Sequence, residues 1–224
     1  MSIRFAQKGI NVKLKRNIRI LFDIYKKSTF LEFIRTMSGA LFRNELIYIY
    51  AIDVATLSGI IKEMNRDNDT DGKVIIKKGE IEELEAYCKR ANAKAWEFYC
   101  HRYDGVDEFF IAKDGDTICC ITWIYKKNDP NRFLILGETD ALVQYGLTLP
   151  QYRGHGLLPA VLQAIAQYLG TQGYRRVYGM ILESNRSSIR GTTKAGFVKV
   201  GEVRYRKILG MQFSGKHDVS RLSQ

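Results

Sequence analysis

The sequence is poor in the residues that mark metal sites, linkers and membrane spans. It has three histidines, three prolines and four cysteines in 224 residues. The cysteines show none of the spacings that bind a metal or form a redox pair, so we expect reduced thiols and no metal. They are Cys88, Cys100, Cys119 and Cys120. No apolar run approaches the roughly 18 residues that suggest a transmembrane helix.

Two further absences narrow the class of protein. The first residues, Met1 to Arg4, do not lead into the apolar core and small-residue cleavage site of a signal peptide, so we expect a cytoplasmic protein. An apolar fraction of 46% with 26% charged residues excludes intrinsic disorder. A chain of this length buries enough surface to fold without disulfides or metals.

Charge is unevenly distributed along the chain. The net charge of +11 fits nucleic acid, a lipid surface or an anionic small molecule as a partner. Residues 1–50 carry ten basic and three acidic side chains, and residues 151–224 carry twelve and three. Residues 51–150 carry thirteen basic and eighteen acidic side chains. The chain is therefore basic at both ends and acidic in the middle.

Residues 1–70 predict a basic extension of two helices and a strand. Apolar side chains recur at helical spacing over 18–25 and 30–41, and 46–54 has the composition of a strand. The polar stretch 65–72 is the best boundary candidate. Three roles fit the extension: a solvated helix pair, a docking surface for an anionic partner or lipid headgroups, or part of a homodimer contact. Its basic residues include Lys13, Lys15, Arg16, Arg19, Lys26 and Lys27.

Residues 71–212 predict one mixed α/β (α+β) domain, followed by a tail at 213–224, because strand and helix patterns alternate there. We expect strands at 74–76, 109–112, 117–125, 139–149 and 176–182, and helices at 81–88, 93–103, 158–169 and 187–194. Lys113 to Asp116 has the composition of a hairpin turn. Residues 197–209 predict a pair of strands around Gly201 and Glu202.

The strongest local signal is Gln151-Tyr152-Arg153-Gly154-His155-Gly156, between the strand at 139–149 and the helix at 158–169. A glycine-rich turn at a helix N-terminus presents backbone N–H groups to an anion, and Arg153 adds a positive charge. The spacing is neither that of a dinucleotide-binding loop nor that of a P-loop. By itself the segment is either a plain turn or a phosphate site.

A second motif accompanies the first. Asn185-Arg186-Ser187-Ser188-Ile189 opens a helix that runs into Lys194-Ala195-Gly196-Phe197. With both motifs at this separation, the sequence resembles the GNAT superfamily of acyl-CoA-dependent N-acyltransferases over about 74 to 210. The resemblance implies a mixed, mostly antiparallel central sheet flanked by helices, and acetyl-CoA as cosubstrate.

The resemblance also implies the residues that contact coenzyme A. The loop residues Gln151, Arg153, Gly154, His155, Gly156 and Leu157 are expected around the phosphates. Leu147 and Leu149 match the strand whose backbone pairs with the pantetheine amides. Asn185 caps its helix, and it either bonds the pantetheine arm as well or acts as a cap alone. Ser188 fills a position that is often small in the family.

Catalytic residues are less clearly marked. Glu138 and Asp140 lie two apart at a strand start, and the resemblance offers them as the general base; solvated turn residues are the alternative. Many relatives protonate the departing thiolate with a tyrosine at the position that is Thr192 here. Tyr145, Tyr178 and Tyr205 are candidate substitutes, and water is another. His155 is expected to be an exposed loop side chain.

The sequence thus predicts an N-acetyltransferase that moves an acetyl group to a primary amine by direct attack. The acidic middle segment favours a cationic acceptor. The N-terminal extension resembles those of GNAT proteins from surface-polysaccharide gene sets, and this resemblance implies an amino sugar as acceptor. A non-catalytic acyl-CoA-binding or sensing module on the same fold is the competing class. A nucleic-acid-binding protein is disfavoured, because the chain lacks aromatic residues interleaved with basic ones and any known binding motif.

Overall fold

The computed structural model describes residues 42–56, 74–131, 133–208, 211–212 and 217–219. The chain divides into two compact units, one of residues 1–44 with 205–213 and the other of residues 45–204 with 214–224. The helices expected before residue 42 and the turn-prone stretch at 65–72 lie outside the described residues. In the first unit, the description covers strand ends and a hairpin that pairs Lys207 with Gln212.

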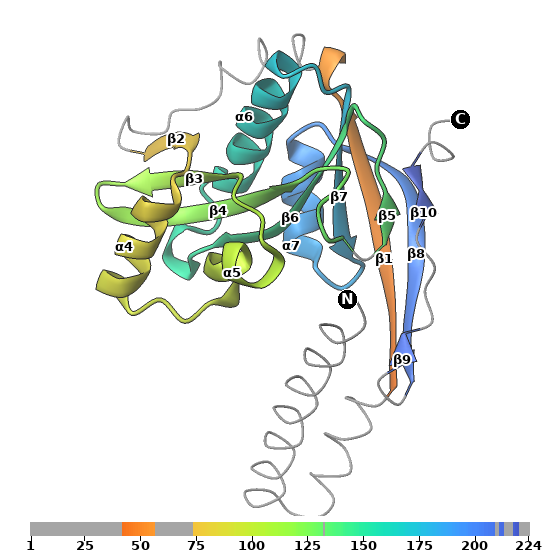
Figure 1. Cartoon of the computed structure of the whole chain (residues 1–224), viewed down its shortest axis with the longest axis horizontal. Coiled ribbons are helices and arrows are strands. Elements are labelled where there is room, and N and C mark those ends of the chain that lie inside the picture. The colour runs from red at the N-terminus through yellow and green to blue at the C-terminus, as the bar shows by residue number, and fades with distance from the viewer. Residues whose placement is uncertain (1–41, 57–73, 132, 209–210, 213–216, 220–224) are drawn as a thin grey trace, which may run out of the picture. The chain divides into compact units, whose positions relative to one another are not determined.

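Among the described residues, the second unit contains most of the helices and strands (Figure 1). The strands are β1 (Phe42–Asp53), β2 (Val74–Lys78), β3 (Phe109–Asp114), β4 (Thr117–Tyr125), β5 (Leu134–Ile135), β6 (Asp140–Thr148), β7 (Arg176–Leu182), β8 (Val198–Ile208), β9 (Met211–Gln212) and β10 (His217–Asp218). The α-helices are α4 (Ile81–Ala91), α5 (Cys100–Asp104), α6 (Leu157–Thr171) and α7 (Arg186–Lys194). The described residues also form the 3-10 turns η1 (Val54–Thr56), η2 (Trp96–Tyr99) and η3 (Pro150–Tyr152).

The strands form a mixed sheet in the order β2-β3-β4-β6-β7-β1-β8-β9. The pairs β2–β3, β3–β4, β4–β6, β1–β7 and β8–β9 are antiparallel, whereas β6 and β7 are parallel. A parallel pair needs a crossover, and α6 provides it between β6 and β7. The mostly antiparallel sheet with flanking helices confirms the fold class expected from the sequence.

Helices cover both faces of the sheet (Figure 1). In β3, Phe109 and Ile111 pack into a core with α4 and η2, whereas Phe110 and Ala112 pack into a second core with α6. This alternation follows from the two-residue period of a strand, and it explains why β3 and β4 are apolar on both sides. The second core includes α6 residues at helical spacing: Leu157, Val161, Leu162, Ile165, Ala166 and Leu169.

Several sequence predictions agree with the structure in detail. The strand at 176–182 has the expected bounds, and the hairpin after β3 turns through Gly115, whose φ is 56°. All four cysteines are free and buried. Within the described part of the chain, no helix is both long and apolar enough to cross a bilayer.

Two predicted elements differ from the structure. The pair of strands expected around Gly201 is one continuous strand, β8, in which Gly201 has extended backbone and Val203 faces the core. The helix expected at 93–103 is divided into η2 and α5. The carbonyl of Glu97, which a continuous helix would use internally, instead accepts a hydrogen bond from the Trp123 indole at 2.6 Å.

The predicted limits at residues 70 and 212 also differ from the two compact units. β1 lies inside the central sheet, where Ile47 to Asp53 pairs with β7 from Leu182 back to Arg176. A boundary at 70 would remove this strand from the sheet. In the tail, His217 and Asp218 pair with β5, and Val219 is buried in the core. Long-range pairing of this kind leaves no local signal in the sequence.

Candidate functional site

The parallel strands β6 and β7 separate partway along their length. Their pairing runs from Asp140 and Arg176 to Val143 and Gly179 and ends there. β6 continues to Thr148, paired with β4 on its other side. The register of β4 and β6 shifts at the same level, and Tyr145 has a φ of 55°. A β-bulge thus bends β6 away from β7 and leaves one edge of its backbone without a strand partner among the described residues.

A cavity of about 540 Å³ opens beside this separation. Gly146, Leu147 and Thr148 of β6 contribute to one wall, and the opening of α7 contributes to another. The volume is in the range of ordinary small-molecule sites. The remaining lining residues are Glu97, Tyr152, Arg153, Gly154, Gly156, Leu157, Leu158, Pro159, Asn185, Ser187, Ser188, Arg190, Gly191 and Lys194.

The loop between η3 and α6 brings backbone N–H groups to the cavity. Gly154 and Gly156 have φ values of 86° and 72°, a region that side chains disfavour, and Gly156 is the N-cap of α6. A Cβ atom at either glycine would meet nothing within 4 Å, so both face open space. The 15-residue helix α6 therefore begins at the cavity with its positive dipole end directed there.

Three basic side chains add to this positive potential. Arg153, Arg190 and Lys194 line the cavity and are exposed. Nε of Arg153 donates to the carbonyl of Thr148 at 3.2 Å, which holds the guanidinium at the end of β6. The loop and these three cations form a positively charged surface at the cavity, of a kind that attracts anions.

Asn185 organises the wall that α7 contributes. It is the N-cap of α7, and its Oδ1 accepts from the Ser188 backbone N–H at 3.1 Å and from the Ser187 hydroxyl at 3.0 Å. This arrangement uses the acceptor of the amide for capping. The amide nitrogen donates to no described residue and is available to a ligand in the cavity.

The structure brings most of the predicted cofactor residues together. Leu147, Arg153, Gly154, Gly156, Leu157, Asn185 and Ser188 all line the cavity. Leu149, Gln151 and His155 do not: Leu149 packs against the core, and the other two side chains are exposed. The backbone N–H of Leu149 is already bonded to the Cys119 carbonyl at 2.9 Å.

The two candidate bases lie outside the cavity lining. Glu138 is exposed and forms an ion pair with Lys127. Asp140 accepts from the Gly137 backbone N–H at 2.9 Å and caps the turn that leads into β6. Both side chains thus have contacts that fit the turn at the beginning of the strand.

The tyrosines named from the sequence as candidate proton donors, and Thr192, are not among the lining residues of the cavity. Thr192 is buried and does not line the cavity. Tyr178 is buried as well, and burial raises the pKa of its phenol. Tyr145 packs edge-on against Trp96 and Tyr125. Tyr205 belongs to the other unit of the chain.

Some lining residues were not predicted from the sequence. Ser187, Arg190, Gly191 and Lys194 recur at helical spacing on α7, so the face that carries Ser187 also carries the others. That signal was present in the sequence. Glu97 had none, because it comes from a short 3-10 turn about 50 residues before the bulge.

Comparison with known proteins identifies the fold. No protein-family model matches the chain, and no curated protein matches its sequence. Solved structures do match. A GCN5-related N-acetyltransferase from Sphaerobacter thermophilus is 14% identical, with a TM-score of 0.50, over 84% of this chain and 58% of its own.

Two other solved structures are similar to the same extent. A Drosophila protein is 11% identical, with a TM-score of 0.52, over 80% of this chain and 56% of its own. A conserved Staphylococcus epidermidis protein of unknown function is 14% identical, with a TM-score of 0.50, over 82% of this chain and 69% of its own. This chain thus spans less than two thirds of the Sphaerobacter and Drosophila proteins. With the parallel β6–β7 pair, the bulge and the loop before α6, the chain has the fold of the GNAT acetyltransferases.

Proposed function

We propose that this protein is an acyl-CoA-dependent N-acyltransferase, which transfers an acetyl group from acetyl-CoA to a primary amine of a small molecule by direct attack. The observation that carries the proposal is the cavity at the start of α6. There a loop with two positive-φ glycines, a helix N-terminus and three cations meet the free edge of β6. Phosphates and an extended amide-bearing chain are what these groups recognise.

The residues present fit coenzyme A. The open space beside Gly154 and Gly156 is a cradle that any side chain would begin to fill. The backbone from Gly154 to Leu157 would hold the pyrophosphate, with Arg153, Arg190 and Lys194 close enough to neutralise phosphate charge. Gly146 to Thr148 and the amide nitrogen of Asn185 would bond the pantetheine arm. Both motifs noted in the sequence therefore contribute to one cavity.

Acetyl-CoA supplies an activated thioester carbonyl, and this chain has to orient it, admit the amine and accept protons. Among the described lining residues, Tyr152 is the one tyrosine. Its hydroxyl donates to Asp114 at 3.0 Å, and this bond, with burial, raises the pKa of Tyr152 to about 12. Such a phenol is a poor acid at neutral pH. We therefore assign protonation of the departing thiolate to water.

Because Tyr152, the one tyrosine among the described lining residues, is a poor acid, there is a second candidate, a non-catalytic acyl-CoA-binding or sensing module. Fold alone does not separate it from an enzyme. The contacts of Glu138 and Asp140 do not indicate a catalytic role, so the acyltransferase proposal does not need either residue as a base. An amino sugar is one acceptor class within the proposal.

Turnover on an amine panel tests the proposal. The purified full chain is incubated with acetyl-CoA and amino sugars, diamines, amino acids and neutral hydroxyl compounds, and thiol release is followed. We expect release with at least one amine and none with the hydroxyl compounds. Coenzyme A binding without release on any amine would support the sensing module instead. Absence of binding by calorimetry would contradict both.

A further inference from the structure

The cavity is asymmetric in charge. Its one acidic lining residue among the described residues is Glu97, on η2, whereas its basic residues lie on the loop before α6 and on α7. Phe98, next to Glu97, packs in the core on the α4 side of the sheet, and Leu157 packs in the core on the α6 side. The cavity is therefore lined from both faces of the sheet and crosses it where β6 and β7 separate.

The backbone of Glu97 is held firmly. Its carbonyl accepts from the Trp123 indole at 2.6 Å, and the Cys100 thiol lies 3.7 Å from the same oxygen. Trp123 of β4 and Phe98 are both buried, so η2 is anchored at the Glu97 carbonyl and at the residue that follows it. A carboxylate on such an anchored turn has a defined position at the cavity, which a binding group requires.

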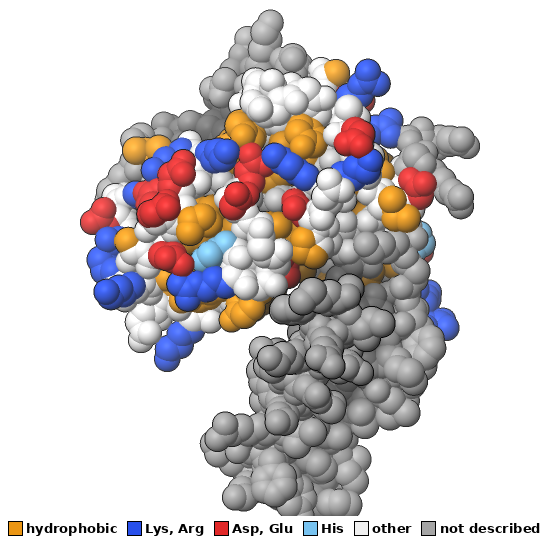
Figure 2. Space-filling view, in the orientation of Figure 1, with side chains coloured by type: hydrophobic (Ala, Val, Ile, Leu, Met, Phe, Trp, Pro, Cys, Tyr) orange, Lys and Arg blue, Asp and Glu red, His pale blue; other side chains and the backbone are white. Residues whose placement is uncertain are grey.

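The Glu97 carboxylate has no hydrogen-bond or ion-pair partner among the described residues, unlike several other glutamates of the acidic middle segment. Glu83 pairs with Lys77 and Lys113, and Glu85 pairs with Arg102. Acidic and basic side chains are accordingly interspersed on the face shown in Figure 2. Ion pairs with neighbouring basic side chains thus neutralise part of the negative charge of residues 51–150. Among the described residues, Glu97 is the acidic residue of this segment that lines the cavity.

Aromatic side chains surround the η2 turn that carries Glu97. Trp96 is 47% exposed, unusual for a large apolar side chain, and its ring meets that of Tyr145 edge-on at 4.6 Å. Tyr145 is the positive-φ residue of the bulge, so the aromatic pair sits where β6 bends. The exposed indole of Trp96 and the unpaired carboxylate of Glu97 stand on the same turn, and both kinds of group attract an ammonium, through cation–π contact and ion pairing.

We propose that Glu97 and Trp96 form the acceptor subsite, which selects a cationic primary amine, and that Glu97 takes the proton that makes this amine nucleophilic. The inference rests on the proposed acyltransferase function. The ammonium loses one proton to the Glu97 carboxylate, which later releases it to solvent. The neutral amine then forms a C–N bond with the thioester carbon as the C–S bond breaks. The second nitrogen proton goes through water to the thiolate, so an amide and a free thiol result.

The test compares Glu97→Gln with Glu82→Gln in the full chain. Glu82 is an exposed carboxylate on α4 that does not line the cavity, and it controls for loss of charge. For Glu97→Gln we expect kcat/KM for the amine to fall by about 100-fold. The rise of kcat/KM with pH that reports deprotonation of the general base should also disappear from its pH profile. KM for acetyl-CoA should not change. Trp96→Ala should raise KM for the amine more than Trp96→Phe does.

The outcomes separate the subsite from the function. Amine kinetics and pH profile unchanged in Glu97→Gln would overturn the subsite, and so would a wild-type protein that turns over only neutral or anionic acceptors. Either result would leave the acyltransferase function standing. Amine binding to the protein saturated with coenzyme A, measured by calorimetry, gives a readout without turnover. It should weaken in Glu97→Gln, and equal binding in both variants would also overturn the subsite.

Discussion

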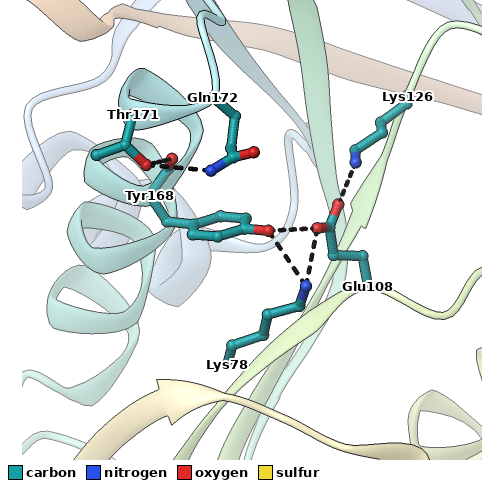
Figure 3. Close-up of polar contacts among 6 residues, drawn as sticks. All are labelled: Lys78, Glu108, Lys126, Tyr168, Thr171 and Gln172. Carbon is teal, nitrogen blue, oxygen red and sulfur yellow. Dashed lines mark hydrogen bonds and ion pairs between the residues drawn. The ribbon is translucent and has the colours of Figure 1, made fainter.

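The hydroxyl of Tyr168 on α6 donates to Oε1 of Glu108 at 2.7 Å, and Lys78 and Lys126 bond the same carboxylate (Figure 3). Glu108 directly precedes β3, and Lys78 ends β2. This cluster joins the helix that begins at the cavity to the β2–β3–β4 side of the sheet. We infer that it fixes the tilt of α6 and, through it, the position of the loop at the helix start.

Removing the Tyr168 hydroxyl should destabilise the protein. We expect Tyr168→Phe to lower the free energy of unfolding by about 1 kcal/mol. The substitution removes one hydrogen-bond donor from the Glu108 carboxylate, which is largely shielded from water that could replace it. Tyr103→Phe is the matched control, since Tyr103 is 66% exposed. Urea unfolding at neutral pH measures the free energy of unfolding of both variants. Equal stability of the two variants would show that the hydrogen bond contributes nothing.

The same cluster predicts a pH dependence. Burial pushes the pKa of Glu108 upward, but hydrogen bonds from Lys126, Tyr168 and Lys78 outweigh burial and hold this pKa below its ordinary value. The carboxylate therefore stabilises the fold fully above the unfolded-state pKa of about 4.3, and this stabilisation disappears as the pH falls through the lower folded-state pKa. The difference in unfolding free energy between wild type and Glu108→Gln should stay constant above about pH 5 and shrink below pH 4. A difference that grew on acidification would contradict the assignment.

Gly154→Glu should abolish binding of coenzyme A. The new side chain would place a carboxylate where phosphates are expected, and its backbone would be strained at a φ of 86°. Gly115→Glu provides the control, because Gly115 also has a positive φ and open space around it but lies in the β3–β4 turn. Calorimetric titration with coenzyme A should show loss of binding in the first variant alone. Unchanged affinity in Gly154→Glu would remove the phosphate loop from the proposal.

Arg190→Gln should weaken coenzyme A binding by roughly tenfold, since a charge-assisted hydrogen bond to phosphate is lost. Arg186→Gln on the same helix is the control, because Arg186 is exposed and does not line the cavity. The effect of Arg190→Gln should diminish as salt is added, because salt screens exposed charges. Equal losses in both variants would indicate a general effect of net charge.

The cysteines should be inert toward thiol reagents in the folded protein. All four are buried, and burial raises the pKa of Cys120 to about 11 and that of Cys100 to about 12. Because the thiolate is the reactive form, we expect negligible labelling by a disulfide reagent in native buffer and four labelled thiols per chain after unfolding. Rapid native labelling would contradict this, and it would also complicate assays of thiol release.

The two binding segments could be predicted because their chemistry is local. A loop that places glycines before a helix builds its anion site from consecutive residues, and Asn185 caps the helix in which it stands. Glu138 and Asp140 were weaker candidates because the role of a carboxylate depends on what surrounds it. In the structure their nearest partners are Lys127 and the Gly137 backbone, neither of which lines the cavity.

The sequence by itself determined the strand–loop–helix units and the alternation of apolar residues that gives a sheet covered on both faces. Those features depend on neighbours within a few residues. Only the tertiary structure decided that β1 joins the sheet beside β7, that β6 parts from β7 at Val143, and that Glu97 reaches the cavity. Each depends on register and packing between segments far apart in the chain, for which no local pattern exists.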